Sequence, residues 1–125
     1  MENARILLID DDPNVHKIYG ESLRSNGFEV IEAMNGADGY ALALKEHPDL
    51  ILLDLLMPEM TGFDVMEKLR KDSWGKSAKV VVLSNLDKQD NELRVANHFV
   101  FDYLNKSTCT LDDVSIPLTY TPTTP

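Results

Sequence analysis

The stretch Asp49-Leu-Ile-Leu-Leu-Asp-Leu-Leu-Met-Pro58 decides the fold of this chain. Residues 50–53 are all apolar, without the alternation of polar side chains that a half-exposed strand shows, and Pro48 and Pro58 stand on either side. Such a run is typical of a strand that is buried on both faces of a parallel sheet. The run ends in Asp54, at the carboxyl end of the strand, where open α/β sheets form their ligand crevice. Asp54 is therefore the first candidate for a functional residue.

Other apolar segments also end in polar side chains. Each is predicted to be a strand: residues 6–9 before Asp10 and Asp11, residues 80–83 before Ser84, and residues 99–104 before Lys106. If these strands lie parallel, their carboxyl ends bring three carboxylates, a hydroxyl and an ammonium group to one edge of the sheet. We expect the active site at this edge.

Helical patterns separate the strands. Apolar residues recur at helical spacing after Asp12-Pro13, which has the form of a helix start, and Asn26-Gly27 supplies the stop. A more exposed strand is expected at residues 28–33, and further helices at residues 37–46, 63–71 and, more weakly, 87–97. Strands alternating with helices indicate right-handed βαβ units. The predicted fold is α/β: a doubly wound, five-stranded parallel sheet of order 2-1-3-4-5, the flavodoxin-like arrangement.

The end of the chain departs from this alternation. A helix start at Thr110 is stopped by Pro117 after about one turn, and a Thr/Pro-rich tail follows. We therefore expect one domain over residues 1–109, with residues 110–125 forming a short helical turn and tail. The fifth helix is predicted to be short or missing.

Composition restricts the class of protein. The 125 residues suit a single domain, the one cysteine cannot form an internal disulfide, and no leader or long apolar run is evident. We therefore expect a cytoplasmic protein with no membrane association. The formal charge of −9 argues against direct binding to nucleic acid, which draws on clustered Lys and Arg.

The predicted cluster of acids suggests metal chemistry. Asp10, Asp11 and Asp54 would repel one another unless a cation lay among them. Oxygen ligands favour Mg²⁺, or else Mn²⁺, over Zn²⁺. A divalent ion beside a carboxylate can hold a phosphoryl donor while Asp54 attacks it and becomes an aspartyl phosphate. Ser84 and Lys106 are placed to contact the remaining phosphoryl oxygens.

In these motifs the chain resembles the receiver domains of two-component response regulators. The resemblance covers about residues 4–108 and rests on Ile6-Leu-Leu-Ile-Asp-Asp-Asp-Pro13, on Asp49 to Pro58 with Thr61-Gly62, on Val80-Val-Val-Leu-Ser84 and on Asp102-Tyr-Leu-Asn-Lys106. It implies that Asp54 is the phosphoacceptor, with Mg²⁺ held by Asp10, Asp11, Asp54 and the backbone carbonyl of Leu56. It further implies phosphoryl contacts from Ser84 and Lys106, and a switch formed by Ser84 and Tyr103. Ser107 departs from the family, in which proline usually follows the lysine.

The resemblance implies a signalling switch rather than an enzyme acting on a separate substrate. A histidine kinase or phosphotransfer protein would donate the phosphoryl group, and the receiver would catalyse only its own phosphorylation and dephosphorylation. An output domain or partner, and a dimer, are compatible with the sequence. Asp12 is expected to cap the first helix rather than bind the metal, and His16 is expected to be an ordinary surface residue.

Other functions fit parts of the sequence. Asp10-x-Asp12 resembles the nucleophile motif of the haloacid-dehalogenase phosphatases, which would make Asp10 the nucleophile. A flavin-binding module would need a phosphate cradle of Ser, Thr and Gly in its first loop, where this chain has three aspartates. A docking module independent of phosphorylation is the remaining alternative.

Overall fold

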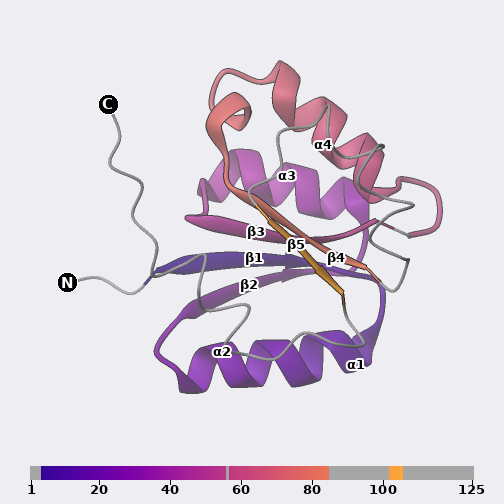
Figure 1. Ribbon diagram of the computed structural model, residues 1–125. Helices are drawn as coiled ribbons and strands as arrows, with labels where there is room; N and C mark the ends of the chain where they lie inside the picture. The colour runs from indigo at the N-terminus through magenta and orange to yellow at the C-terminus, as the bar shows by residue number, and fades with distance from the viewer. Residues whose placement is uncertain (1–3, 56, 85–101, 106–125) are drawn as a thin grey trace.

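The described part of the chain is built around one parallel sheet. The computed structural model describes residues 4–55, 57–84 and 102–105, and Figure 1 draws the rest as a thin grey trace. Its five strands lie in the order β2-β1-β3-β4-β5, and every neighbouring pair is parallel. The strands are β1 (Arg5–Ile9), β2 (Glu29–Ala33), β3 (Leu50–Asp54), β4 (Val80–Ser84) and β5 (Asp102–Asn105). The predicted fold class and strand order are confirmed.

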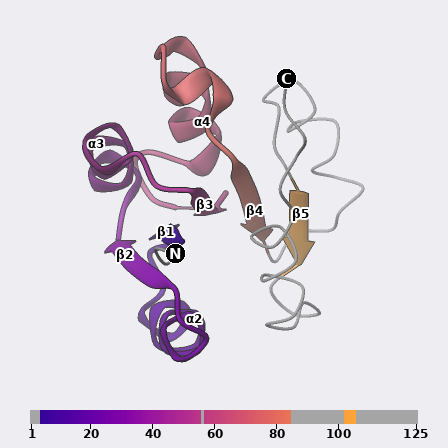
Figure 2. The ribbon, with the colours of Figure 1, turned by 90° about the vertical axis from the view of Figure 1, so that its left-hand side faces the viewer.

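Helices cover both faces of the sheet. In Figure 1, α1 and α2 lie below the strands and α3 and α4 lie above them, and Figure 2 shows the same layers from the side. The helical segments are α1 (Pro13–Val15), the π-helical η1 (His16–Gly20), α2 (Glu21–Ser25), α3 (Gly36–Glu46), α4 (Gly62–Lys71) and the 3-10 turn η2 (Gly75–Ser77). None of these described helices has the length and apolar character needed to cross a membrane.

The central strands bury both of their faces. Successive residues of β1 alternate between the two cores: Ile6 and Leu8 pack with the α1–α2 layer, and Leu7 and Ile9 pack with the α3–α4 layer. All five residues of β3 are buried. Burying one such aliphatic side chain contributes about 1.5–3 kcal/mol, so these runs supply much of the driving force for folding. The prediction that residues 50–53 form a doubly covered strand is confirmed.

The first helix begins as predicted but is not a regular α-helix. The Asp12 carboxylate accepts a hydrogen bond from the Asn14 N–H at 2.9 Å, and Pro13 occupies the first turn. The segment η1 then inserts a π-helical turn before α2. A π turn holds more residues than an α turn, so it shifts the positions that follow. Helical spacing from Val15 predicts that Ile18, Tyr19 and Leu23 share the buried face; Ile18 lies within this turn and is 60% exposed, whereas Tyr19 and Leu23 are buried.

A close junction between β3 and α4 positions Asp54. The Thr61 hydroxyl accepts a hydrogen bond from the Asp64 N–H, and the Asp64 carboxylate accepts one from the Thr61 N–H, so the two residues form a capping box. Gly62 starts the helix and donates its N–H to the Leu55 carbonyl at 3.1 Å. A Cβ at Gly62 would overlap the Asp54 carbonyl oxygen. Only glycine lets α4 begin this close to the end of β3.

Some predicted features lie outside the described residues. They are the helix at residues 87–97, the first part of the strand predicted at residues 99–104, and the turn and tail at residues 110–125.

Candidate functional site

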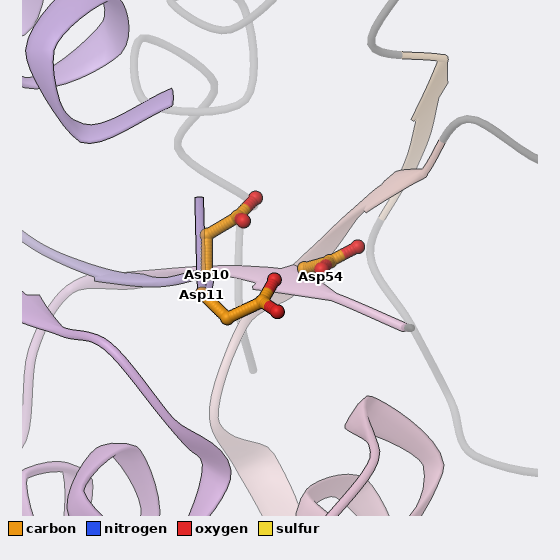
Figure 3. A group of neighbouring side chains, drawn as sticks. All are labelled: Asp10, Asp11 and Asp54. Atoms are coloured by element: carbon orange, nitrogen blue, oxygen red, sulfur yellow. The ribbon is translucent and has the colours of Figure 1, made fainter. Parts of the chain in front are cut away.

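Three carboxylates meet at the carboxyl edge of the sheet. The register pairs Ile9 of β1 with Leu53 of β3, which brings the next residues, Asp10 and Asp54, opposite one another. Each of Asp10, Asp11 and Asp54 offers a carboxylate oxygen, and these oxygens all lie within 4.8 Å of one another. Figure 3 shows the three side chains gathered at the ends of the two strands. Residues 44 positions apart in the chain thus form one acidic cluster, as the alignment of parallel strand ends predicts.

The three acids differ in exposure. Asp10 is 0% exposed and Asp54 is 3% exposed, whereas Asp11 is exposed. The Asp10 carboxylate accepts a hydrogen bond from the Asp12 N–H at 2.9 Å, and its backbone N–H donates to the Ala33 carbonyl at 3.2 Å. Burying a carboxylate is costly unless opposite charge or hydrogen bonds stabilise it. Two buried acids beside a third therefore favour the binding of a cation.

The donor set fits Mg²⁺. Among the described residues, Asp10, Asp11 and Asp54 form the one group of three or more His, Cys, Asp or Glu side chains that could hold a metal ion. The group contains neither histidine nor cysteine, and carboxylate oxygens are the ligands that Mg²⁺ and Mn²⁺ prefer. Mg²⁺ commonly takes one or two carboxylates and keeps other positions for water or phosphoryl oxygens. One exposed ligand beside two buried ones is compatible with such an open site.

The other predicted site residues are only partly described. Ser84 is the last residue of β4, directly after Leu83, which pairs with Asp54. Tyr103 of β5 pairs with Val82, and Asn105 pairs with Ser84. The backbones of β3, β4 and β5 therefore end at the same edge. The side chains of Ser84 and Tyr103, and all of Leu56 and Lys106, lie outside the described residues, so the roles of these four residues stay predictions.

His16 was wrongly predicted to be a surface residue. Its side chain is only 7% exposed and contacts Asp10, directly after β1, and Glu32 of β2. The Nε2 atom is 2.7 Å from the Asp10 carbonyl oxygen, and Nδ1 is 2.9 Å from Glu32 Oε1. Arg24 Nη2 donates to Glu32 Oε2 at 2.9 Å and completes a chain of polar contacts. A lone histidine after a helix start carries no pattern that predicts these contacts with two strands.

The pKa of Glu32 reflects this chain of contacts. Partial burial raises the pKa of the Glu32 carboxyl group, but the hydrogen bonds and positive charges of Arg24 and His16 outweigh that effect. The net result is a pKa lowered from its ordinary value. Glu32 is therefore held in its ionised form beside His16.

Comparisons with known proteins agree with this geometry. The family model described as "Response regulator receiver domain" matches residues 6–114. The chain is 37% identical over 102 residues to the DNA-binding dual master transcriptional regulator RpaA of Synechocystis, covering 82% of this chain and 42% of RpaA. It is 35% identical over 103 residues to Protein PilH of Pseudomonas aeruginosa, covering 82% of this chain and 85% of PilH.

A solved structure of similar fold carries a metal ion. The response regulator TrrA from Thermotoga maritima, determined in complex with Mg(2+)-BeF, superposes with a TM-score of 0.79 at 29% identity, covering 94% of this chain and 96% of TrrA. This chain thus shares its sheet, its order of elements and its sequence motifs with receivers. It belongs to the response regulator receiver domains, the phosphorylation-controlled receivers of two-component signalling.

Proposed function

We propose that Asp54 accepts the phosphoryl group, in a Mg²⁺-dependent reaction with a phosphohistidine donor. The observation that carries this proposal is the approach of the Asp10, Asp11 and Asp54 carboxylate oxygens to within 4.8 Å of one another. Asp54 is the acid at the end of the fully buried strand β3, while Asp10 and Asp11 face it from the neighbouring strand. We therefore assign Asp54 as the nucleophile, with Asp10 and Asp11 beside it as metal ligands.

The chemistry is an in-line transfer. A carboxylate oxygen of Asp54 forms a bond to phosphorus as the bond between phosphorus and the donor's imidazole nitrogen breaks, and that nitrogen keeps the electron pair. Mg²⁺, when bound, supplies positive charge that offsets the negative charge of the phosphoryl oxygens. Asp10 and Asp11 would hold the ion with Asp54, and by family resemblance the Leu56 carbonyl would be a further ligand. Ser84 and Lys106 are proposed to contact the phosphoryl oxygens.

The phosphoryl group then acts as a switch. It adds negative charge at the carboxyl edge of the sheet, next to the end of β4. A conformation in which Ser84 approaches the phosphoryl group and Tyr103 turns inward would be favoured in the phosphorylated state. Receiver domains work with histidine kinases, and we propose that a kinase or phosphotransfer protein is the donor here. Autocatalysed phosphorylation and hydrolysis are the only reactions proposed for the chain.

A labelling experiment tests the acceptor. Wild-type protein incubated with acetyl phosphate and Mg²⁺ should gain one phosphoryl group by intact-mass spectrometry, and omission of Mg²⁺ should prevent the gain. Asp54→Asn should remove the labelling. Asp49→Asn is a matched control, because Asp49 precedes β3 at the opposite end from Asp54, accepts a hydrogen bond from the Arg5 N–H, and lies outside the acidic cluster. Labelling of Asp54→Asn at the wild-type level would refute the assignment.

A further inference from the structure

His16 joins the acidic cluster to the neighbouring strand β2. Its ring faces the Asp10 carbonyl oxygen on one side and the Glu32 carboxylate on the other, at 2.7 and 2.9 Å. A carbonyl and a carboxylate can only accept hydrogen bonds. Both contacts are therefore hydrogen bonds when each ring nitrogen carries a proton, and the contact with Asp10 requires Nε2 to be the donor.

The peptide that receives this hydrogen bond is the one that joins two proposed metal ligands. The Asp10 carbonyl belongs to the peptide group between Asp10 and Asp11, so its orientation sets the direction in which the two acidic residues follow β1. The Asp10 carboxylate, in turn, accepts a hydrogen bond from the Asp12 N–H at 2.9 Å. The turn after β1 is thus held both from its own backbone and from the His16 ring.

The ring itself is held in place by surrounding groups. Glu32 accepts hydrogen bonds from both His16 and Arg24. With only 7% of its side chain exposed, His16 has little freedom to adopt another rotamer.

We infer that His16 is a positioning residue for the Mg²⁺ site, acting through the Asp10–Asp11 peptide, with Glu32 and Arg24 fixing its ring. This inference rests on the proposed function of the acidic cluster. The effect belongs to a known class, in which groups that orient metal ligands change metal affinity by about 10- to 100-fold when they are removed. His16 does not contact the metal or the phosphoryl group in this arrangement.

A matched pair of variants isolates the hydrogen bond. The side-chain amide nitrogen of glutamine reaches about as far from the backbone as Nε2 of histidine, whereas that of asparagine reaches only about as far as Nδ1. His16→Gln can therefore still donate to the Asp10 carbonyl, and His16→Asn cannot. Both variants are neutral and close in size. Isothermal titration with MgCl₂ should show a dissociation constant raised about 10-fold for His16→Asn and near the wild-type value for His16→Gln.

A second pair tests the same inference without changing the histidine. Glu32→Ala removes the acceptor that orients the ring, while Glu29→Ala removes a carboxylate from the same strand that pairs with Arg5 at 3.7 Å, away from the cluster. Glu32→Ala should weaken Mg²⁺ binding several-fold and, in the metal-free protein, speed hydrogen exchange of the Asp12 amide, which donates to the Asp10 carboxylate. Glu29→Ala should do neither. This pair decides the question if the His16 variants do not fold.

The outcomes separate this inference from the proposed function. If the wild type binds Mg²⁺ and the dissociation constants of His16→Asn and Glu32→Ala equal that of the wild type, the positioning role alone is overturned, whatever those variants do to stability. The absence of Mg²⁺ binding in the wild type would overturn the proposed function, and with it the role of His16.

Discussion

Adjacent acids after β1 occupy different environments. Asp10 is buried and Asp11 is exposed, and both contribute oxygens to the acidic cluster, whereas Asp12 caps the helix that follows. Burial and hydrogen bonding, rather than residue type, set their roles. The capping role of Asp12 was predicted from Pro13 and is confirmed by the bond to the Asn14 N–H. Mg²⁺ binding by Asp10 and Asp11 stays a proposal.

Conservative substitutions distinguish these roles. Asp10→Asn should raise the Mg²⁺ dissociation constant by at least about 10-fold, because it removes a charged ligand. Asp12→Asn should leave both Mg²⁺ affinity and stability near wild type, since asparagine caps helices as well as aspartate does. Calorimetric Mg²⁺ titration and urea denaturation check both. Equal losses of affinity in the two variants would make Asp12 a ligand instead of a cap.

Removal of the cap itself has a separate consequence. Asp12→Ala should lower the free energy of unfolding by about 1 kcal/mol, because the Asn14 N–H loses its acceptor. The Mg²⁺ dissociation constant should change far less than in Asp10→Asn. Urea denaturation gives the first quantity and calorimetry the second. An unchanged unfolding free energy would show that the capping bond contributes nothing.

The lowered pKa of Glu32 predicts a pH dependence of stability. A carboxyl group with a lowered pKa in the folded state stabilises the protein above its ordinary value of 4.5, and this contribution disappears as the pH falls through the lowered folded-state pKa. The stability difference between wild type and Glu32→Gln should therefore be fully present at about pH 6 and shrink toward about pH 3. Urea denaturation across this range measures it. A difference that grows on acidification would contradict the shift.

At the scale of elements, the junction of β3 and α4 is the most sensitive place in the site. Gly62→Ala would force a Cβ against the Asp54 carbonyl oxygen. We expect a loss of about 1–3 kcal/mol or more in unfolding free energy, and slower labelling by acetyl phosphate, because the backbone of the acceptor must move. Gly27→Ala is the control: φ at Gly27 is 92°, but a Cβ added there would meet nothing within 4 Å.

The control separates strain from displacement of the acceptor. Gly27→Ala should cost about 1 kcal/mol, because alanine disfavours positive φ. Its labelling rate should equal that of the wild type, since Gly27 follows α2 and lies away from the cluster. Stability by urea denaturation and labelling by intact mass give the comparison. A Gly62→Ala protein that labels at the wild-type rate would show that this junction does not position Asp54.

Strands were easier to predict from sequence than the details of helices. Residues 6–9 and 50–53 are continuous apolar runs because both faces of each strand are buried, and this burial is visible in the residues themselves. The π turn of η1 was not predictable, because it includes His16, whose partners are Asp10, directly after β1, and Glu32 of β2. Periodicity within one segment contains no information about such contacts. Helical spacing also predicts that Ile18 is buried, which is wrong, because its side chain is 60% exposed.

At the scale of the whole molecule, Mg²⁺ binding should stabilise the fold. A ligand that binds only the folded state adds about 1.4 kcal/mol when its concentration is about ten times its dissociation constant. The net charge of −9 means that any salt also relieves repulsion. Thermal unfolding should therefore be compared in MgCl₂ and in NaCl of equal ionic strength. Mg²⁺ should raise the melting temperature more, and Asp10→Asn should abolish the difference. Equal effects of the two salts on the wild type would argue against a specific site.

The position of the acidic cluster was predictable because topology determines it. Once the strands are parallel and in the order 2-1-3-4-5, the residues that follow β1 and end β3 must meet at one edge. The contacts that hold the cluster were harder to predict from the sequence. The turn after β1 makes hydrogen bonds with His16 and with the Asp12 N–H. The start of α4 requires glycine at position 62, because a Cβ there would overlap the backbone of Asp54, and this overlap is seen only when the backbones are placed.

The central claim is that Asp54, and no other acid of the cluster, becomes phosphorylated. The most direct measurement is to phosphorylate the wild type with acetyl phosphate and Mg²⁺, reduce the acyl phosphate with borohydride, and locate the resulting homoserine by peptide mass spectrometry. Homoserine at position 54 alone is the predicted result. Homoserine at position 10 or 11, with position 54 unmodified, would contradict the claim, and position 10 would instead indicate the nucleophile expected of a haloacid-dehalogenase phosphatase.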